Sequence, residues 1–265
     1  MRPIYPFDRR LGYIICGPAM GIRMNDLRKD IHNSEIPELC LSCEARHGGI
    51  CGALSTDQLV RLNKYSSQRT VSDGSEIVGD EEEVTHYAAI LSGVVKLAKT
   101  MSDGRQQIVG LQFAPDFLGR PFQTESLVAA EAASNVRLCV FPKSVIEAMV
   151  REQPELEHRL LQQTLKELDE AREWMLTLGR KTATEKVASF LYLIARNIDP
   201  EAGAEKNVIF EMPLTRADIA DFLGLTIETV SRQLTRLRKA GVIEIENNRH
   251  VAVPSLARLQ RMSGN

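Results

Sequence analysis

The sequence contains no long apolar run. Among its 265 residues, no apolar stretch approaches the roughly 18 to 20 residues that a membrane-spanning helix needs. Charge is nearly balanced, with 33 Lys and Arg against 35 Asp and Glu, which argues against a polybasic tail. Five cysteines are too few for a disulfide-stabilised secreted scaffold. Since 43% of the residues are hydrophobic, the chain can bury a core, and its length fits two domains. We expect a soluble globular protein.

Catalytic signatures are also missing from the sequence. It contains no nucleophile elbow, P-loop or dinucleotide-binding fingerprint. A metal-dependent barrel enzyme needs several histidines clustered on strands. Here the histidines are scattered, and only His86 lies in the predicted barrel; they are His32, His47, His86, His158 and His250. We therefore expect no enzymatic activity.

Residues 1–39 are interpreted as a leader that precedes the folded part of the chain. Arg9-Arg10 comes before a short apolar run and superficially resembles an export signal. Gly17-Pro18 interrupts the run before it reaches the usual length of a signal-peptide core, which disfavours export. We expect a loose leader, with Met20 or Met24 as the true start.

Residues 40–153 are predicted to form a sensor domain built on an antiparallel β-roll. From about 68 to 142, short runs rich in Val and Ile alternate with glycines, a pattern typical of a cupin-like jelly roll. Asp103-Gly104 is a strong hairpin signal between two such runs. Residues 55–65 predict a helix that begins with a capping pattern of Ser55 or Thr56 with Gln58.

Residues 154–180 predict one long helix. Apolar and small residues recur at alternating spacings of three and four, which is the pattern of a helix that pairs with a partner helix. This seam comprises Leu161, Thr164, Leu168, Ala171, Met175 and Leu178. A second strip of Leu160, Leu165 and Trp174 is expected to pack on the roll of the same chain. The pattern predicts a homodimer, and the alternative is one amphipathic helix that packs only on its own roll.

Residues 181–265 are predicted to form a winged helix-turn-helix domain. Thr215 caps a first helix, Gly224 supplies the turn, and Thr226 caps a second helix. Two short alternating runs around Asn247-Asn248 predict a wing. The fold class expected for the whole chain is therefore α+β: an N-terminal β-roll, a long dimerisation helix and a C-terminal winged helix-turn-helix. The inward apolar positions of the two helices are Ile219, Ala220, Phe222, Leu223, Ile227, Val230, Leu234 and Leu237.

The second of these helices has the composition of a DNA-reading surface. Residues 226–241 contain four basic groups and one acid, and residues 181–265 hold 12 Lys and Arg against 10 Asp and Glu. Its polar face carries Glu228, Thr229, Ser231, Arg232, Thr235 and Arg236. Glutamate accepts from cytosine and arginine donates to guanine, whereas Arg236, Arg238 and Lys239 are candidate phosphate contacts. This composition favours DNA binding over an ordinary helical hairpin with a solvated charged face.

The segment LGLTIETVSRQLTRLRKAGVIEI resembles the DNA-binding region of the CRP/FNR regulator superfamily, in particular its FNR branch of FnrN/FnrL type. The resemblance covers about residues 40–255. It implies that Glu228, Ser231 and Arg232 read a TTGAT half-site within a palindrome. It further implies a cytoplasmic bacterial transcription regulator that binds double-stranded DNA as a homodimer and contacts RNA polymerase.

Four of the five cysteines form a candidate metal site. The arrangement is Cys40-x2-Cys43-x7-Cys51, with Cys139 far downstream on a predicted strand. Four thiolates bind either one tetrahedral zinc or one iron–sulfur cube, and spacing alone does not separate the two. The resemblance implies an oxygen-labile [4Fe-4S] cluster whose loaded form is the DNA-binding dimer. Cys16 is assigned no role.

The alternative function is a CRP-type regulator that senses a small molecule and holds a structural zinc at the cysteines. In the nucleotide-binding branch of the superfamily, an Arg-Ser pair clamps the cyclic phosphate. Here Glu125-Ser126 stands at that place, and no arginine lies between Arg120 and Arg137. Because a carboxylate repels a phosphate, the sequence disfavours a cyclic nucleotide as ligand.

Overall fold

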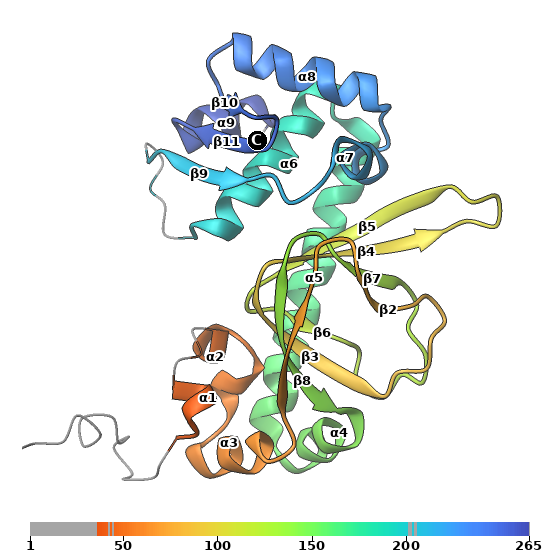
Figure 1. The fold of residues 1–265 in the computed structure, drawn as a ribbon, viewed down its shortest axis with the longest axis vertical. Coiled ribbons are helices and arrows are strands. Elements are labelled where there is room, and N and C mark those ends of the chain that lie inside the picture. The colour runs from red at the N-terminus through yellow and green to blue at the C-terminus, as the bar shows by residue number, and fades with distance from the viewer. Residues whose placement is uncertain (1–35, 42, 44, 201–202, 204–205, 265) are drawn as a thin grey trace, which may run out of the picture.

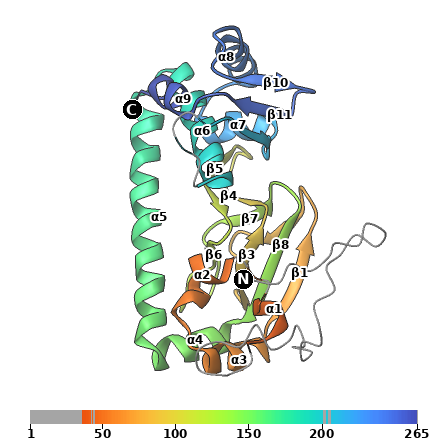
Figure 2. The ribbon, with the colours of Figure 1, turned by 90° about the vertical axis from the view of Figure 1, so that its left-hand side faces the viewer.

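The computed structural model of the chain describes residues 36–41, 43, 45–200, 203 and 206–264. Most of the predicted leader, together with Cys16, lies outside these residues. A β-roll and a C-terminal helical domain lie along one long helix, α5 (Figure 2). Within the described part of the chain, no helix combines the length and apolar character needed to cross a membrane.

Two four-stranded antiparallel sheets form the roll, in the orders β1-β8-β3-β6 and β2-β7-β4-β5. The strands are β1 (Ser67–Val71), β2 (Glu76–Val78), β3 (His86–Ser92), β4 (Val94–Thr100), β5 (Gln106–Phe113), β6 (Phe117–Leu118), β7 (Ala129–Ala132) and β8 (Val136–Pro142). Between the sheets, Ile90 and Leu138 of one sheet pack with Val95 and Ala132 of the other. Alternate residues of each strand thus form the interior of the roll, as the period of two in a strand requires.

The predicted hairpin is formed by β4 and β5, which pair from Val94 with Phe113 to Thr100 with Gln106. Gly104 lies in the turn with a φ of 85°, a value that glycine adopts at little cost. The hairpin extends from the roll beneath helix α7 of the C-terminal domain (Figure 1).

Short helices cover the outer face of β8. They are α1 (Glu38–Leu41), α2 (Ala45–Gly48), the 3-10 helix η2 (Ile50–Ala53), α3 (Thr56–Asn63) and, after β8, α4 (Lys143–Glu152). The predicted capping box is present, because Ser55 and Gln58 each accept a hydrogen bond from the other's backbone N–H. Ile50, Phe141 and Ile146 are fully buried in the apolar cluster beneath these helices.

Helix α5 (Pro154–Arg180) has the predicted bounds and spans the length of the molecule (Figure 2). Its first helical residue is Pro154, a position that needs no N–H donor. Leu160 packs against the cluster under the short helices, and Trp174 packs against the core of the C-terminal domain.

The C-terminal domain is the predicted winged helix-turn-helix. Its elements are α6 (Ala183–Ile198), β9 (Val208–Glu211), α7 (Arg216–Leu223), α8 (Ile227–Lys239), β10 (Glu244–Glu246), β11 (His250–Val253) and α9 (Leu256–Met262). Gly224 ends α7 in the left-handed conformation, and both Asn247 and Asn248 have positive φ in the turn of the wing. The expected fold class is confirmed.

Two packing predictions are wrong. Leu165 was expected against the roll, but it is 51% exposed and lies in an apolar stripe of α5 with Leu161, Leu168, Met175 and Leu176. From Leu161 the stripe continues at spacings of four, three and seven residues to Met175, with Leu176 next to it, so apolar periodicity fits two neighbouring faces of the helix. Ile227 was expected on the buried face of α8 and is 48% exposed, because it stands in the first turn, beyond the reach of the core.

Replacing Gly93 with alanine is expected to destabilise the roll. Its φ is 92°, and an added Cβ would lie 2.5 Å from the backbone oxygen of Asn135. The cost combines left-handed strain with steric overlap, about 2–5 kcal/mol. Gly104→Ala is the matched control, because its φ is 85° but an added Cβ would meet no atom of the described residues within 4 Å. It should cost only about 1–2 kcal/mol. Urea unfolding of both variants measures the difference, and equal losses of stability would contradict the steric argument.

Candidate DNA-reading surface and cysteine site

Helix α8 presents the predicted reading residues to solvent. Val230, Leu234 and Leu237 are buried on its inner face, where α8 packs on α6 and α7. Because an α-helix turns about 100° per residue, Glu228 and Arg232 fall on the opposite face. The other exposed members of the predicted set are Ser231, Thr235, Arg236, Arg238 and Lys239, whereas Thr229 is half-buried.

Local contacts orient two of the reading side chains. Arg232 Nη2 lies 3.0 Å from Oγ1 of Thr229, one turn earlier. The pKa of Glu228 is lowered, first by a hydrogen bond from its own backbone N–H and then by one from Thr226. Glu228 is therefore ionised at neutral pH, and an ionised carboxylate can accept a hydrogen bond from an amino group such as cytosine N4.

Arg236 stands apart from the other basic residues of α8. Its Nη1 lies 3.3 Å from Oγ1 of Thr184, close to the start of α6. Thr184 in turn donates to Gln233 of α8 at 2.8 Å. The predicted phosphate contact is thus anchored at the junction of α6 and α8.

The structure brings the four predicted cysteine ligands together. Cys40 belongs to α1, Cys43 precedes α2, Cys51 lies in η2 and Cys139 is in the middle of β8. All four are free and partly buried, and they line one cavity between the short helices and the outer face of β8. Within the described residues, no group of three or more His, Cys, Asp or Glu side chains is arranged to hold a metal ion.

Burial raises the pKa of the thiols of Cys40, Cys51 and Cys139. It is the largest cause of the rise to about 12 at Cys51, followed by the proximity of Cys139, Cys40 and Cys43. Burial also raises the pKa of Cys139 to about 11, although a hydrogen bond with Ser66 lowers it in part. Since each thiolate repels the others, the set favours a cationic partner that offsets their charge.

The cavity wall includes residues that the sequence analysis did not identify. Arg46, Asn63 and Ser66 line it beside the cysteines. The Oδ1 atom of Asn63 is buried and has no hydrogen-bond partner in the described structure. Arg46 had a signal in the sequence, because it lies inside the cysteine segment. Asn63 is the last residue of α3 and Ser66 follows it, where polar residues are ordinary, so no local pattern marked them.

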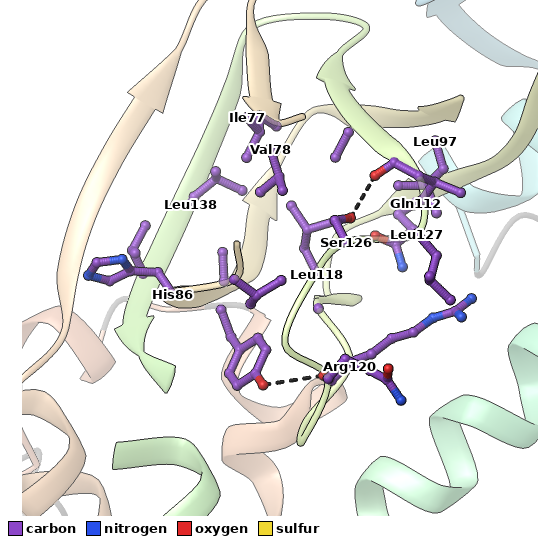
Figure 3. Close-up of a pocket in the computed structure, with 18 of the residues that line it drawn as sticks. Ile77, Val78, His86, Leu97, Gln112, Leu118, Arg120, Ser126, Leu127 and Leu138 are labelled. Atoms are coloured by element: carbon purple, nitrogen blue, oxygen red, sulfur yellow. Dashed lines mark hydrogen bonds between the residues drawn. The ribbon is translucent and has the colours of Figure 1, made fainter. Parts of the chain in front are cut away.

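The roll contains a second cavity, of about 130 Å³, between its two sheets. Ile77, Val78 and Leu138 point into it from one side, opposite Ser126 and Gln112 (Figure 3). The Ser126 hydroxyl donates to the carbonyl of Val128 at 2.6 Å. Glu125 lines this cavity as expected, but Arg120 also reaches it, so the cavity does contain an arginine.

Comparisons with known proteins agree with both halves of this architecture. Residues 68–153 match the cyclic nucleotide-binding domain family, and residues 185–262 match the Crp-like helix-turn-helix domain family. A probable transcriptional activator of Rhizobium leguminosarum bv. viciae is 56% identical over 239 residues, which cover 90% of this chain and 99% of the relative. The transcriptional activator protein FnrL of Cereibacter sphaeroides is 40% identical over 87% of this chain and 95% of its own.

A solved structure supports the same assignment. FixK2 from Bradyrhizobium japonicum superposes with a TM-score of 0.66 at 31% identity. The match covers 74% of this chain and 96% of FixK2.

Replacing Arg232 with alanine should weaken specific DNA binding by about 1–3 kcal/mol and relax the preference at one base position. The reason is the loss of a bidentate contact to a base edge. Binding to a series of duplexes, each changed at one position of a TTGAT half-site, measures the effect. Arg238→Ala is the control and should weaken binding about equally on every duplex. If Arg232→Ala behaves in the same uniform way, Arg232 contacts only phosphate.

Proposed function

Because the chain belongs to the FNR branch of the CRP/FNR family of transcription regulators, we propose that it activates transcription under control of oxygen. In this proposal, Cys40, Cys43, Cys51 and Cys139 hold an oxygen-labile [4Fe-4S] cluster. The loaded protein is a homodimer that binds a palindrome of TTGAT-type half-sites through paired α8 helices. It acts in the cytoplasm, where it reaches chromosomal DNA and RNA polymerase.

The meeting of two distant cysteine segments carries the proposal. Cys40, Cys43 and Cys51 come from the N-terminal helices and Cys139 from a central strand of the roll, yet they line one cavity. Strand β8 turns Leu138 and Val140 into the roll and Cys139 outward, toward the N-terminal helices. The partly buried Cys139 thus faces the same cavity as the three N-terminal cysteines, as a shared ligand set requires.

The donor set fits an iron–sulfur cluster. Four thiolates supply one ligand to each iron of a cube. The positive irons offset the thiolate charges, which burial alone disfavours. Arg46 adds a positive charge at the cavity wall. Asn63 also lines the cavity, and its Nδ2 is the atom that could donate a hydrogen bond to a sulfur of the bound group. When bound, the cluster would supply a redox centre that reacts with oxygen.

A direct contact links the cysteine segment to the long helix. Arg159 of α5 donates to the carbonyls of Gly48 and, at 3.3 Å, Gly49, just before Cys51. Ile50 is 1% exposed and shares an apolar cluster with Leu160 of α5. A change in the position of the cysteine segment would therefore alter its contacts with the N-terminal half of α5.

The exposed apolar stripe of α5 supports pairing with a second copy of the chain. Leu161, Leu168 and Met175 are 53%, 45% and 74% exposed, a large apolar area for one surface helix. Ala171 and Leu178 of the predicted seam lie along one edge of this stripe, and Leu178 is half-buried. Pairing along it would place two α8 helices on DNA with twofold symmetry, as a palindrome requires.

The second candidate is a small-molecule sensor with a structural zinc at the cysteines. The cavity inside the roll, with Arg120 and Gln112 on its wall, is the observation that favours it. The two candidates differ in the metal that the cysteines hold.

Replacing Cys139 with serine should abolish cluster loading and leave the fold intact, because β8 pairs through its backbone with β1 and β3. Iron and sulfide analysis of protein purified without oxygen measures the loading, and circular dichroism checks the fold. Cys16→Ser is the matched control and should keep its full iron content. Full iron loading in Cys139→Ser would falsify the ligand assignment.

A further inference from the structure

Lys96, on β4 of the roll, makes a buried contact with the DNA-binding domain. Its Nζ lies 2.6 Å from Oδ1 of Asp218 in α7 and 2.9 Å from Oε1 of Glu131 in β7. The Lys96 side chain is only 9% exposed. A buried lysine between two carboxylates of different domains is uncommon, since lysine rarely leaves water without such pairing.

The Asp218 carboxylate makes two separate contacts, one with each oxygen. Its Oδ2 accepts from the backbone N–H of Thr215 at 3.0 Å and so caps the N-terminus of α7. Its Oδ1 accepts from Lys96. Burial alone would raise the pKa of Asp218, but the hydrogen bonds from Lys96 and Thr215 outweigh it and lower the pKa. One carboxylate thus fixes both the start of α7 and its place on the roll.

The same hairpin also holds the other end of α7. Gln107 of β5 donates through Nε2 to the carbonyl of Asp221 at 2.6 Å and to that of Phe222 at 3.3 Å. Between these two polar contacts, Ile108 of the hairpin shares a continuous apolar core with Ile219 of α7. The first helix of the helix-turn-helix is therefore held along its length by the roll.

The chemistry of this contact favours orientation over stability. A buried ion pair adds little net stability relative to apolar residues of the same size, but it penalises every arrangement that leaves one charge unpaired. Turning or sliding α7 on the hairpin would separate Lys96 from Asp218 inside the interface. Because α7 packs directly on α8, the orientation of α7 sets that of the reading face.

We propose that Lys96 is a positioning residue for DNA recognition, which acts through Asp218 to hold the reading face of α8 in the orientation that binds a palindrome. Lys96 contacts no DNA in this proposal. It transmits the position of the roll to α8, and it does so whatever group the cysteines hold.

The test compares Lys96→Met with Lys99→Met in the full chain purified without oxygen. Lys99 lies on the same strand, but its partner is Asp80 of the roll at 2.8 Å, and its side chain is 45% exposed. Binding is measured on a duplex with inverted TTGAT half-sites and on a scrambled duplex, each over a range of salt concentrations. Lys96→Met should weaken binding to the palindrome about tenfold and lower the ratio of specific to non-specific affinity. Lys99→Met should bind as the unchanged chain does.

The salt dependence separates positioning from direct contact. Loss of a phosphate contact lowers the slope of affinity against salt by about one, whereas loss of positioning leaves it unchanged. The proposal would be overturned if Lys96→Met bound the palindrome as tightly as Lys99→Met or more tightly. It would also be overturned if Lys96→Met lost affinity equally for both duplexes with a reduced salt slope.

Two further variants keep the test decisive if Lys96→Met folds poorly. Asp218→Asn keeps a capping side chain and removes the charge. Gln107→Leu breaks the contact at the other end of α7. Both should weaken palindrome binding in the same direction, and Asp218→Asn combined with Lys96→Met should lose less than the sum of the two. Unchanged binding in both single variants would overturn the proposal as well.

Discussion

The arrangement of this molecule depends on the packing of one helix against three other parts of the chain. Near its start, Arg159 of α5 holds the cysteine segment. In its middle, Gln163 donates to the carbonyl of Phe117 in the roll at 3.2 Å. Near its end, Trp174 lies 4.4 Å from Phe222 of α7, measured between ring centroids. A shift of α5 would therefore change its contacts with the cysteine segment, the roll and the DNA-binding domain at the same time.

The roll adds a second connection to the same domain. The β4–β5 hairpin reaches α7 directly, so α7, on which the reading helix α8 packs, is held both by α5 and by the roll (Figure 1). Two attachments from different directions fix an orientation that either one alone would leave free to rotate. This is the property that a regulator needs if a change at one end of the molecule is to alter DNA binding at the other. Both attachments bury apolar area, and the buried Lys96 adds directional specificity.

Local signals explain how much of the fold was predictable. Asp103-Gly104 marks the hairpin, the Thr215 cap and Gly224 mark the helix-turn-helix, and the apolar periodicity gives the bounds of α5. Each of these depends on residues a few positions apart. Helix α9 was not predicted, although Ser255 caps it, because seven residues are too few for a clear period.

Features that depend on distant residues were not predictable in the same way. The contact of Lys96 with Asp218 joins residues 122 positions apart, and nothing near either one signals the other. Leu165 is exposed because the roll contacts α5 on the face that carries Gln163 and Glu167, and apolar periodicity alone does not show which face that is. The cysteine grouping was anticipated because the resemblance named its members. The neighbours of the cysteines at the cavity wall were not, because only the fold brings Asn63 to them.

We propose that a cluster on the four cysteines controls pairing along α5. The most direct test is sedimentation of the full chain purified without oxygen, with iron, sulfide and zinc analysis and an absorbance spectrum, before and after exposure to air. We expect a coloured dimer with about four irons per chain, which bleaches in air and dissociates as iron is lost. One zinc per chain without visible colour, or a dimer that persists after the cluster has gone, would contradict it.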